Sequence, residues 1–158
     1  MPVMRGIILF VLAVLLWTGM AYIIHRLAHW RGSCNILYRL HAVHHGPRYA
    51  GGSGQLRWHH FLLCFGSPAE TLDIWITLTL PALLICLVLP MQGLLLFMFH
   101  YFYEIFCSDG QLDHNPNLSG PITRTFAWGD YHLRHHRDPS RNYGLILTVW
   151  DYVFSTAT

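Results

Sequence analysis

The stretch His132-Leu133-Arg134-His135-His136 repeats the spacing of an earlier stretch, His41-Ala42-Val43-His44-His45. On a helix, residues three and four positions apart share a face, so each HxxHH motif can direct three imidazoles towards one point. A third motif, His25-Arg26-Leu27-Ala28-His29, places two more histidines four residues apart. Neutral imidazole is a common ligand of first-row transition metals, and eight histidines are too many for one ion. The three motifs therefore predict one metal centre that holds more than one ion.

The composition indicates a membrane protein. Of the 158 residues, 53% are hydrophobic and 11% are charged, against roughly 25% charged in a soluble domain. All ten basic residues are arginines scattered along the chain, so no basic patch is available for the phosphates of a nucleic acid. The four cysteines form no CxxC pair, which argues against a zinc knuckle or a disulfide framework.

The first crossing is predicted from an uncharged apolar run between Gly6 and Ile24, because about 20 such residues are needed to span a bilayer core. We expect a helix over residues 6–29 whose last turns carry two histidines to the membrane surface. A cleaved signal peptide is the alternative, since Arg5 precedes the run. The run is long for that role, however, and no A-x-A site follows it.

The next segment mixes polar and apolar residues. Residues 30–40 have a pattern suited to a short helix at the membrane interface, which leads into the first HxxHH motif. Gly46-Pro47 should end this helix, and the glycine-rich residues 51–54 predict a flexible loop. Arg57-Trp58 then resembles a membrane-interface anchor.

Residues 68–108 are expected to form a helical hairpin. Its first helix begins with Ser67 at the N-cap and Glu70 three residues later, the pattern of a capping box. Pro81 should kink this helix, and Pro90 marks the turn to a second apolar run. We expect both runs to cross the membrane. Because each is near the lower length limit, a re-entrant hairpin is the alternative.

The arginines predict the orientation. Nine of the ten lie in the two segments that three crossings would leave on one face, and Arg5 alone lies on the other. By the positive-inside rule that face is cytoplasmic, and the histidine motifs lie on it too. The expected fold is an all-α integral membrane bundle with about three membrane-crossing helices. It forms a single domain over residues 1–158, with a cytoplasmic-face segment over residues 109–158 and a histidine-rich metal site on that face.

Nine histidines are expected to converge there, the eight of the motifs and one that follows the hairpin. They are His25, His29, His41, His44, His45, His114, His132, His135 and His136. Nine imidazoles would give each of two metals four or five nitrogen ligands. The chain has no ExxH pair and no HExxH motif, which argues against a carboxylate-bridged diiron bundle and a zinc protease.

A pair of irons with nitrogen ligands can bind dioxygen and, given two electrons, oxidise an unactivated C–H bond. At a membrane surface the substrate would be a lipid chain or ring. The alternative is a non-catalytic metal-binding or metal-transport membrane protein. A transporter is expected to place its ligands near the bilayer midplane, whereas these histidines gather beyond the helix ends, and this favours the enzyme.

Three histidines outside the motifs are weaker candidates for metal binding. His100, within the second run of the hairpin, is expected to bond a tyrosine or Glu104 rather than a metal. His59 and His60 lie beside the interface residues. The candidates for orienting ligand imidazoles from behind are Asn142, Asp151 and Glu104. Asp151 is equally suited to capping and anchoring the terminal segment.

The motifs HRLAH, HAVHH and HLRHH, followed by NYG and WDYVFST, resemble the fatty acid hydroxylase and sterol desaturase superfamily of membrane non-haem diiron enzymes. The resemblance covers residues 25–156. It implies a membrane oxygenase that uses two iron ions and dioxygen to hydroxylate or desaturate a fatty acyl, sterol or carotenoid-like lipid. The nine histidines match the family's ligands, with no further catalytic residue, and zinc can replace iron on isolation. With no fused cytochrome domain, the resemblance implies a separate electron donor protein.

The chain also departs from the family pattern. Cys107 and Gln111 stand where fatty acid 2-hydroxylase members carry a further pair of histidines, which leaves the lipid class open. The terminal FST replaces the usual FGT, and there are fewer hydrophobic segments than the usual four.

Overall fold

The computed structural model describes residues 2–32, 34–46 and 56–158. In these ranges the chain is helical and contains no strand, apart from an isolated antiparallel bridge between Phe126 and Leu147. In chain order the elements are α1 (Pro2–Ala28), α2 (Ile36–His41), η2 (Trp58–Leu62), α3 (Pro68–Ile74), η3 (Trp75–Thr79), α4 (Leu80–Val88), α5 (Pro90–Phe106), η4 (Pro121–Arg124), α6 (Asp130–Arg137) and α7 (Val149–Val153). The all-α prediction is confirmed for the described part of the chain.

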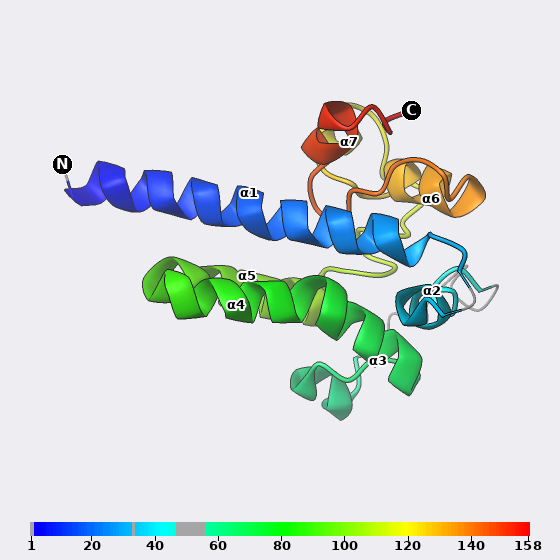
Figure 1. The fold of residues 1–158 in the computed structure, drawn as a ribbon, viewed down its shortest axis with the longest axis horizontal. Helices are drawn as coiled ribbons and strands as arrows, with labels where there is room; N and C mark the ends of the chain where they lie inside the picture. The colour runs from blue at the N-terminus through cyan, green and yellow to red at the C-terminus, as the bar shows by residue number, and fades with distance from the viewer. Residues whose placement is uncertain (1, 33, 47–55) are drawn as a thin grey trace.

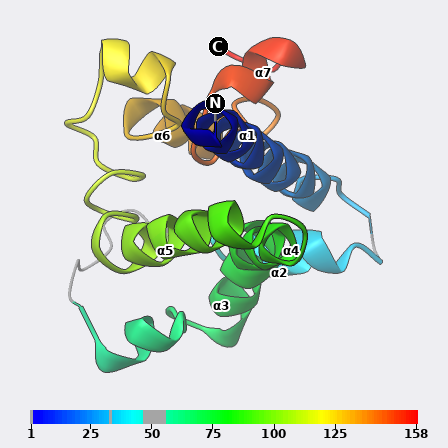
Figure 2. The same cartoon turned by 90° about the vertical axis from the view of Figure 1, so that its left-hand side faces the viewer.

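Helix α1 lies between two layers. The α4–α5 hairpin packs on one side of it, and α6 and α7 lie on the other, as both views show (Figures 1 and 2). The indole Nε1 of Trp150, in α7, donates to Thr18 Oγ1 at 3.0 Å. Gly19 makes room for this ring, since a Cβ there would lie 3.0 Å from it. The C-terminal segment is therefore fixed to the first helix.

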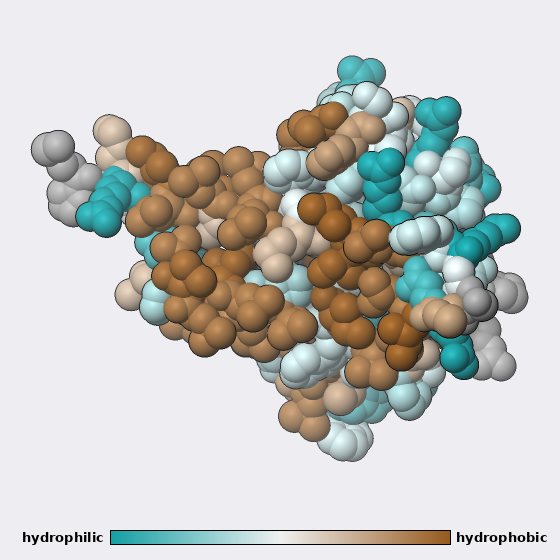
Figure 3. Space-filling view, in the orientation of Figure 1, coloured by the Kyte–Doolittle hydropathy of each residue, from teal (hydrophilic) through white to brown (hydrophobic). Residues whose placement is uncertain are grey.

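Two helical stretches, Val3–Ala28 and Pro68–Val88, are long and apolar enough to cross a membrane. On the face shown in Figure 3, apolar side chains cover α1 and the hairpin, and polar side chains gather towards the opposite end. Helix α5 has 17 residues, which gives about 25 Å at ~1.5 Å per residue, close to the bilayer core of about 30 Å. A crossing by α5 therefore stays a prediction.

The helix that Pro81 is expected to kink is irregular just before this proline, over Trp75–Thr79. The π-helical segment η3 separates α3 from α4, and a π turn is one way a helix can accommodate a proline, which lacks an N–H group. The carbonyl of Leu78, within η3, accepts a hydrogen bond from Trp17 Nε1 at 2.9 Å. The π-helical segment is therefore hydrogen-bonded to α1. The predicted capping box at Ser67 and Glu70 is confirmed.

The hairpin turns at one residue, Leu89, and Pro90 already begins α5. Gly93 lets the two helices approach closely, because a Cβ there would lie 2.5 Å from the Cys86 backbone. The helix predicted over residues 6–29 begins earlier, at Pro2, and ends one residue before His29.

The interfacial helix predicted over residues 30–40 is the shorter α2, which begins after its N-cap Asn35. It ends at His41, before Gly46, and Pro47 and the predicted loop over residues 51–54 lie outside the described residues. The side chain of Trp58 is exposed, as an interface anchor requires.

Candidate metal centre

The structure brings all nine histidines together in two groups. The five-histidine group contains His25, His29, His41, His45 and His135, and the four-histidine group contains His44, His114, His132 and His136. Within each group the candidate ligand nitrogens lie within 4.8 Å of one another. Because a zinc–imidazole bond is about 2.0–2.1 Å long, nitrogens that share an ion lie at most about twice that distance apart. The spacing is therefore close to that of two metal sites.

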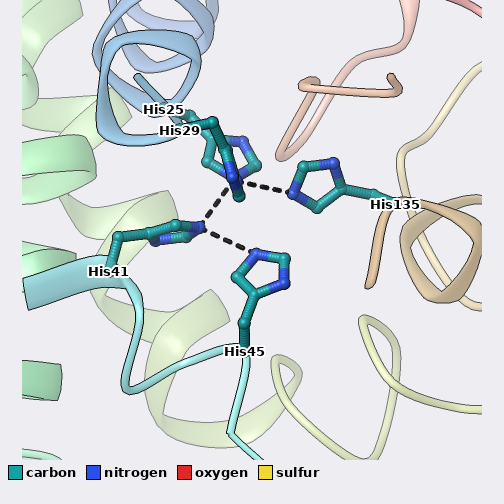
Figure 4. Close-up of side chains that lie close together, drawn as sticks. All are labelled: His25, His29, His41, His45 and His135. Atoms are coloured by element: carbon teal, nitrogen blue, oxygen red, sulfur yellow. Dashed lines mark hydrogen bonds between the residues drawn. The ribbon is translucent and has the colours of Figure 1, made fainter. Parts of the chain in front are cut away.

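The five-histidine group is built by the end of α1, by α2 and the turn after it, and by α6 (Figure 4). Its Nε2 atoms face one another. His25 Nε2 lies 3.0 Å from His41 Nε2, and His41 Nε2 lies 3.1 Å from His45 Nε2. His29 Nε2 lies 2.9 Å from His135 Nε2. Three separate parts of the chain thus direct the same ring nitrogen into one space.

The four-histidine group has the same inward arrangement. His136 Nε2 lies 3.1 Å from His132 Nε2, 3.2 Å from His44 Nε2 and 3.0 Å from His114 Nε2. The two groups adjoin, since the rings of His45 and His136 stack with centroids 4.3 Å apart. Two ions held in these groups would be neighbours.

The expectation that each HxxHH motif directs three imidazoles to one point is wrong. His41 and His45 belong to one group and His44 to the other, while His132 and His136 are separated from His135 in the same way. The physical reason is tertiary: His41 ends α2 while His44 and His45 lie in the turn after it, and other segments, including α1 and α6, supply the nitrogens that complete each group. Each motif therefore contributes to both groups.

Burial favours the neutral form of several of these imidazoles, and the neutral form is the one that binds metal. Desolvation lowers the pKa of His45 to about 4 and that of His136 to about 3, with smaller contributions from neighbouring histidines. The pKa values of His132 and His135 are also lowered well below the ordinary value, again first by burial.

This burial predicts that the metal-free protein loses stability in acid. Below pH about 6.5 the unfolded chain takes up protons on these histidines, while the folded chain does not until about pH 4 for His45 and about pH 3 for His136. The unfolded state then binds more protons, so the free energy of unfolding falls as the pH falls from about 6.5 towards 4. Thermal unfolding of the metal-free protein in detergent at several pH values measures this. A midpoint that stays constant or rises over that range would contradict it.

Three imidazoles of the five-histidine group also form a hydrogen bond through Nδ1, the ring nitrogen that faces away from the group. His41 Nδ1 lies 2.8 Å from Asp73 Oδ2, and the Nδ1 atoms of His25 and His135 lie 2.7 and 2.6 Å from backbone carbonyls. A carbonyl accepts only from an N–H, so Nδ1 carries the proton in His25 and His135 and their Nε2 lone pairs face the group. Such outer partners fix the ring and raise its basicity as a ligand.

Asp73 was missed by sequence reasoning, which took its helix only as a membrane span. The sequence did contain a hint of its role: Asp73 is a second carboxylate on a largely apolar helix, three residues after the capping Glu70. Its partner, His41, lies 32 residues away in the sequence, so spacing alone does not pair them.

Replacing Asp73 with alanine is expected to weaken metal binding by about 10-fold or more, because the His41 ring loses its orienting acceptor. Asp73→Asn, which keeps an acceptor oxygen, should lose less. Equilibrium competition with a chromophoric zinc chelator measures the change, and Asp130→Ala, at a half-exposed carboxylate that pairs with Arg134, is the matched control. Equal affinities for wild type and Asp73→Ala would contradict the assignment.

The other candidates have different surroundings. Asn142 bonds Thr158 through both ends of its amide, rather than an imidazole. His100 Nε2 shares a hydrogen bond with Thr79 Oγ1 at 2.9 Å, whereas its Nδ1 lies 3.7 Å from the Glu104 carboxylate, beyond hydrogen-bond distance, so the bond expected with a tyrosine or Glu104 is made with a threonine instead. Among the described residues, the clusters that could hold a metal do not include His59 or His60.

Asp151 does not contact an imidazole directly. Its carboxylate accepts four hydrogen bonds from nearby backbone and hydroxyl groups. Two of these donors are the backbone N–H groups of Tyr143 and Gly144, and the carbonyl of Tyr143 is the partner of His25.

Two cavities reach the metal centre. One of about 80 Å³ lies between the four-histidine group and the hairpin, where Ile74, Leu78 and Ile146 supply apolar walls. The other, of about 560 Å³, lies against the five-histidine group and is lined in part by polar residues such as Arg31 and Ser140. Both cavities therefore border candidate metal ligands, and carboxylates such as Asp73 and Glu104 share the wall of the smaller one.

Comparison with known proteins gives one match. A family model described as fatty acid hydroxylase matches residues 10–156, a range that contains the hairpin and all nine histidines. Neither the curated proteins nor the solved structures provided a match.

Proposed function

The chain belongs to the fatty acid hydroxylase family, and from this membership we propose that it is a membrane oxygenase that hydroxylates or desaturates a lipid C–H bond with dioxygen as co-substrate. The observation that carries the proposal is the convergence of nine imidazoles into two adjacent groups within the matched range. The apolar surface of α1 and the hairpin supports a position in the membrane.

We propose that the two groups bind two iron ions, with the nine histidines as ligands. The donor set supports this assignment, because imidazole suits iron as well as zinc and neither group contains a thiolate. Zinc is expected to occupy the same sites in protein isolated without added iron. Bound iron would supply the activation of dioxygen, with electrons from a separate donor protein.

The residues around the groups prepare these sites. Asp73 and the carbonyls behind His25 and His135 orient the ligand rings before any ion arrives. Burial favours the unprotonated form of His45, His132, His135 and His136. The small cavity beside the four-histidine group, with Ile74, Leu78 and Ile146 in its wall, supports an approach to the centre from the hairpin side. The chemistry proposed for this chain is thus confined to the end of the bundle.

We further propose three membrane crossings, by α1, by the α3–α4 stretch and by α5, with the metal centre on the cytoplasmic face. Nine of the ten arginines flank that side, which supports the orientation. The lipid, acyl or ring-shaped, would enter from the membrane, and the electron donor would approach from the aqueous side.

The experiment is an oxygenase assay in lipid nanodiscs. Protein reconstituted with iron and given a chemical reductant is exposed to ¹⁸O₂ with acyl and sterol lipids, and the products are examined by mass spectrometry. We expect iron-dependent ¹⁸O incorporation or a new double bond, and neither with zinc-loaded protein. Stable binding of iron without oxygen consumption on any lipid would instead support a non-catalytic metal-binding or transport protein.

A further inference from the structure

The side chain of Asp151 is fully buried and holds together separate parts of the C-terminal segment. Its Oδ1 accepts from the Tyr143 N–H and from Thr156 Oγ1, both at 2.7 Å. Its Oδ2 accepts from the Gly144 N–H at 2.8 Å and from the Tyr131 hydroxyl at 2.9 Å. Four donors on one carboxylate stabilise a charge that burial would otherwise make costly.

Two of these donors belong to residues 141–144, which we name the carbonyl loop. The loop's carbonyls at Arg141 and Tyr143 are the acceptors for His135 Nδ1 and His25 Nδ1. The aromatic ring of Tyr143 also packs against His25, His29 and His135, with centroids 5.6–6.0 Å apart. All three histidines belong to the five-histidine group.

The backbone of the carbonyl loop takes an unusual path. Asn142 has a φ of 56°, a left-handed conformation that most side chains disfavour. A Cβ at Gly144 would lie 2.6 Å from the Leu147 carbonyl oxygen and 2.8 Å from Asp151 Oδ2, so glycine permits the close approach. A backbone in a disfavoured conformation needs contacts from the surrounding structure to stabilise it. The Asp151 carboxylate supplies two, by accepting hydrogen bonds from the successive backbone N–H groups of Tyr143 and Gly144.

We infer that Asp151 is a positioning residue that sets the metal affinity of the five-histidine group through the carbonyl loop, and does not set that of the four-histidine group. The inference rests on the proposed metal centre. With the loop held, its two carbonyls fix the proton of His25 and His135 on Nδ1 and direct each Nε2 inward. Outer contacts of this kind typically change metal affinity by about 10–100-fold.

The test measures zinc affinity in two backgrounds that separate the groups. His132→Ala/His136→Ala removes two ligands of the four-histidine group, and His25→Ala/His29→Ala removes two of the five-histidine group. Asp151→Asn is added to each, which turns an acceptor oxygen into an NH₂ that faces an N–H of the loop. We expect zinc binding to weaken about 10-fold or more in the first background and less than about 3-fold in the second.

The controls distinguish positioning from a general loss of structure. Asp130→Asn, at a half-exposed carboxylate on α6 that pairs with Arg134 and Arg137, should leave both affinities unchanged, and thermal unfolding of the metal-free variants checks folding. Thr156→Val keeps the carboxylate and removes one donor, so it should show the same selectivity at smaller size even if Asp151→Asn does not fold. Equal weakening in both backgrounds, or none in the first, overturns the inference. Absence of zinc binding in both backgrounds with Asp151 intact overturns the proposed metal centre itself.

Discussion

Replacement of His135 by alanine is expected to abolish lipid oxidation, with a loss of more than about 100-fold, while the protein still inserts into the membrane. Changes to residues that only orient a ligand cost about 10–100-fold, so loss of the ligand itself should cost more. The side chain of His135 is fully buried, and its Nε2 lies 2.9 Å from that of His29. Product formation, iron content and membrane fractionation of the variant measure the three consequences.

The matched control is His59→Ala. His59 Nδ1 donates to the Cys64 carbonyl at 2.7 Å, away from the metal centre, so this variant should retain turnover and iron. Full activity of His135→Ala, in the presence of an unaltered iron content, would remove the five-histidine group from the chemistry.

Replacement of Trp17 by alanine is expected to lower the free energy of unfolding by about 3–5 kcal/mol, the range for large aromatic residues in a core. Trp17 is fully buried where α1 packs on the hairpin, and its ring makes a T-shaped contact with that of His100, with centroids 5.7 Å apart. Its loss leaves a cavity and also removes the donor to the Leu78 carbonyl in the π-helical segment. Reversible unfolding in detergent or bicelles measures the change.

Trp30→Ala is the control for this loss, because the side chain of Trp30 is 73% exposed and its removal should change stability by about 0.5 kcal/mol or less. Similar losses for the two variants would contradict the position assigned to Trp17. A large loss at Trp17 alone would show that the α1–hairpin contact is a main source of stability.

Much of the fold could be predicted because its signals are local. The apolar run that becomes α1, the capping box at Ser67, and the break at Pro90 each depend on neighbouring residues. The gathering of the histidine motifs followed from placing both helix ends on one side of the membrane. The role of the nine histidines as iron ligands stays a prediction.

The details of the metal centre depended on contacts between distant segments and could not be predicted. Nothing in an HxxHH spacing says that His44 and His41 separate into different groups, because that depends on where α6 and α1 supply the remaining nitrogens. Asp73 meets His41 only once α3 packs against α2. The groups that accept from His25 and His135 are backbone carbonyls, and because every residue has one, the sequence does not indicate which of them bind. These outer contacts are where the sequence is least informative.

The most direct measurement is Mössbauer spectroscopy of protein reconstituted anaerobically with ⁵⁷Fe, before and after exposure to oxygen. The account predicts two irons per chain and a coupled diiron signal that changes when oxygen is admitted. A single iron, or tightly held zinc with no iron uptake, would contradict it.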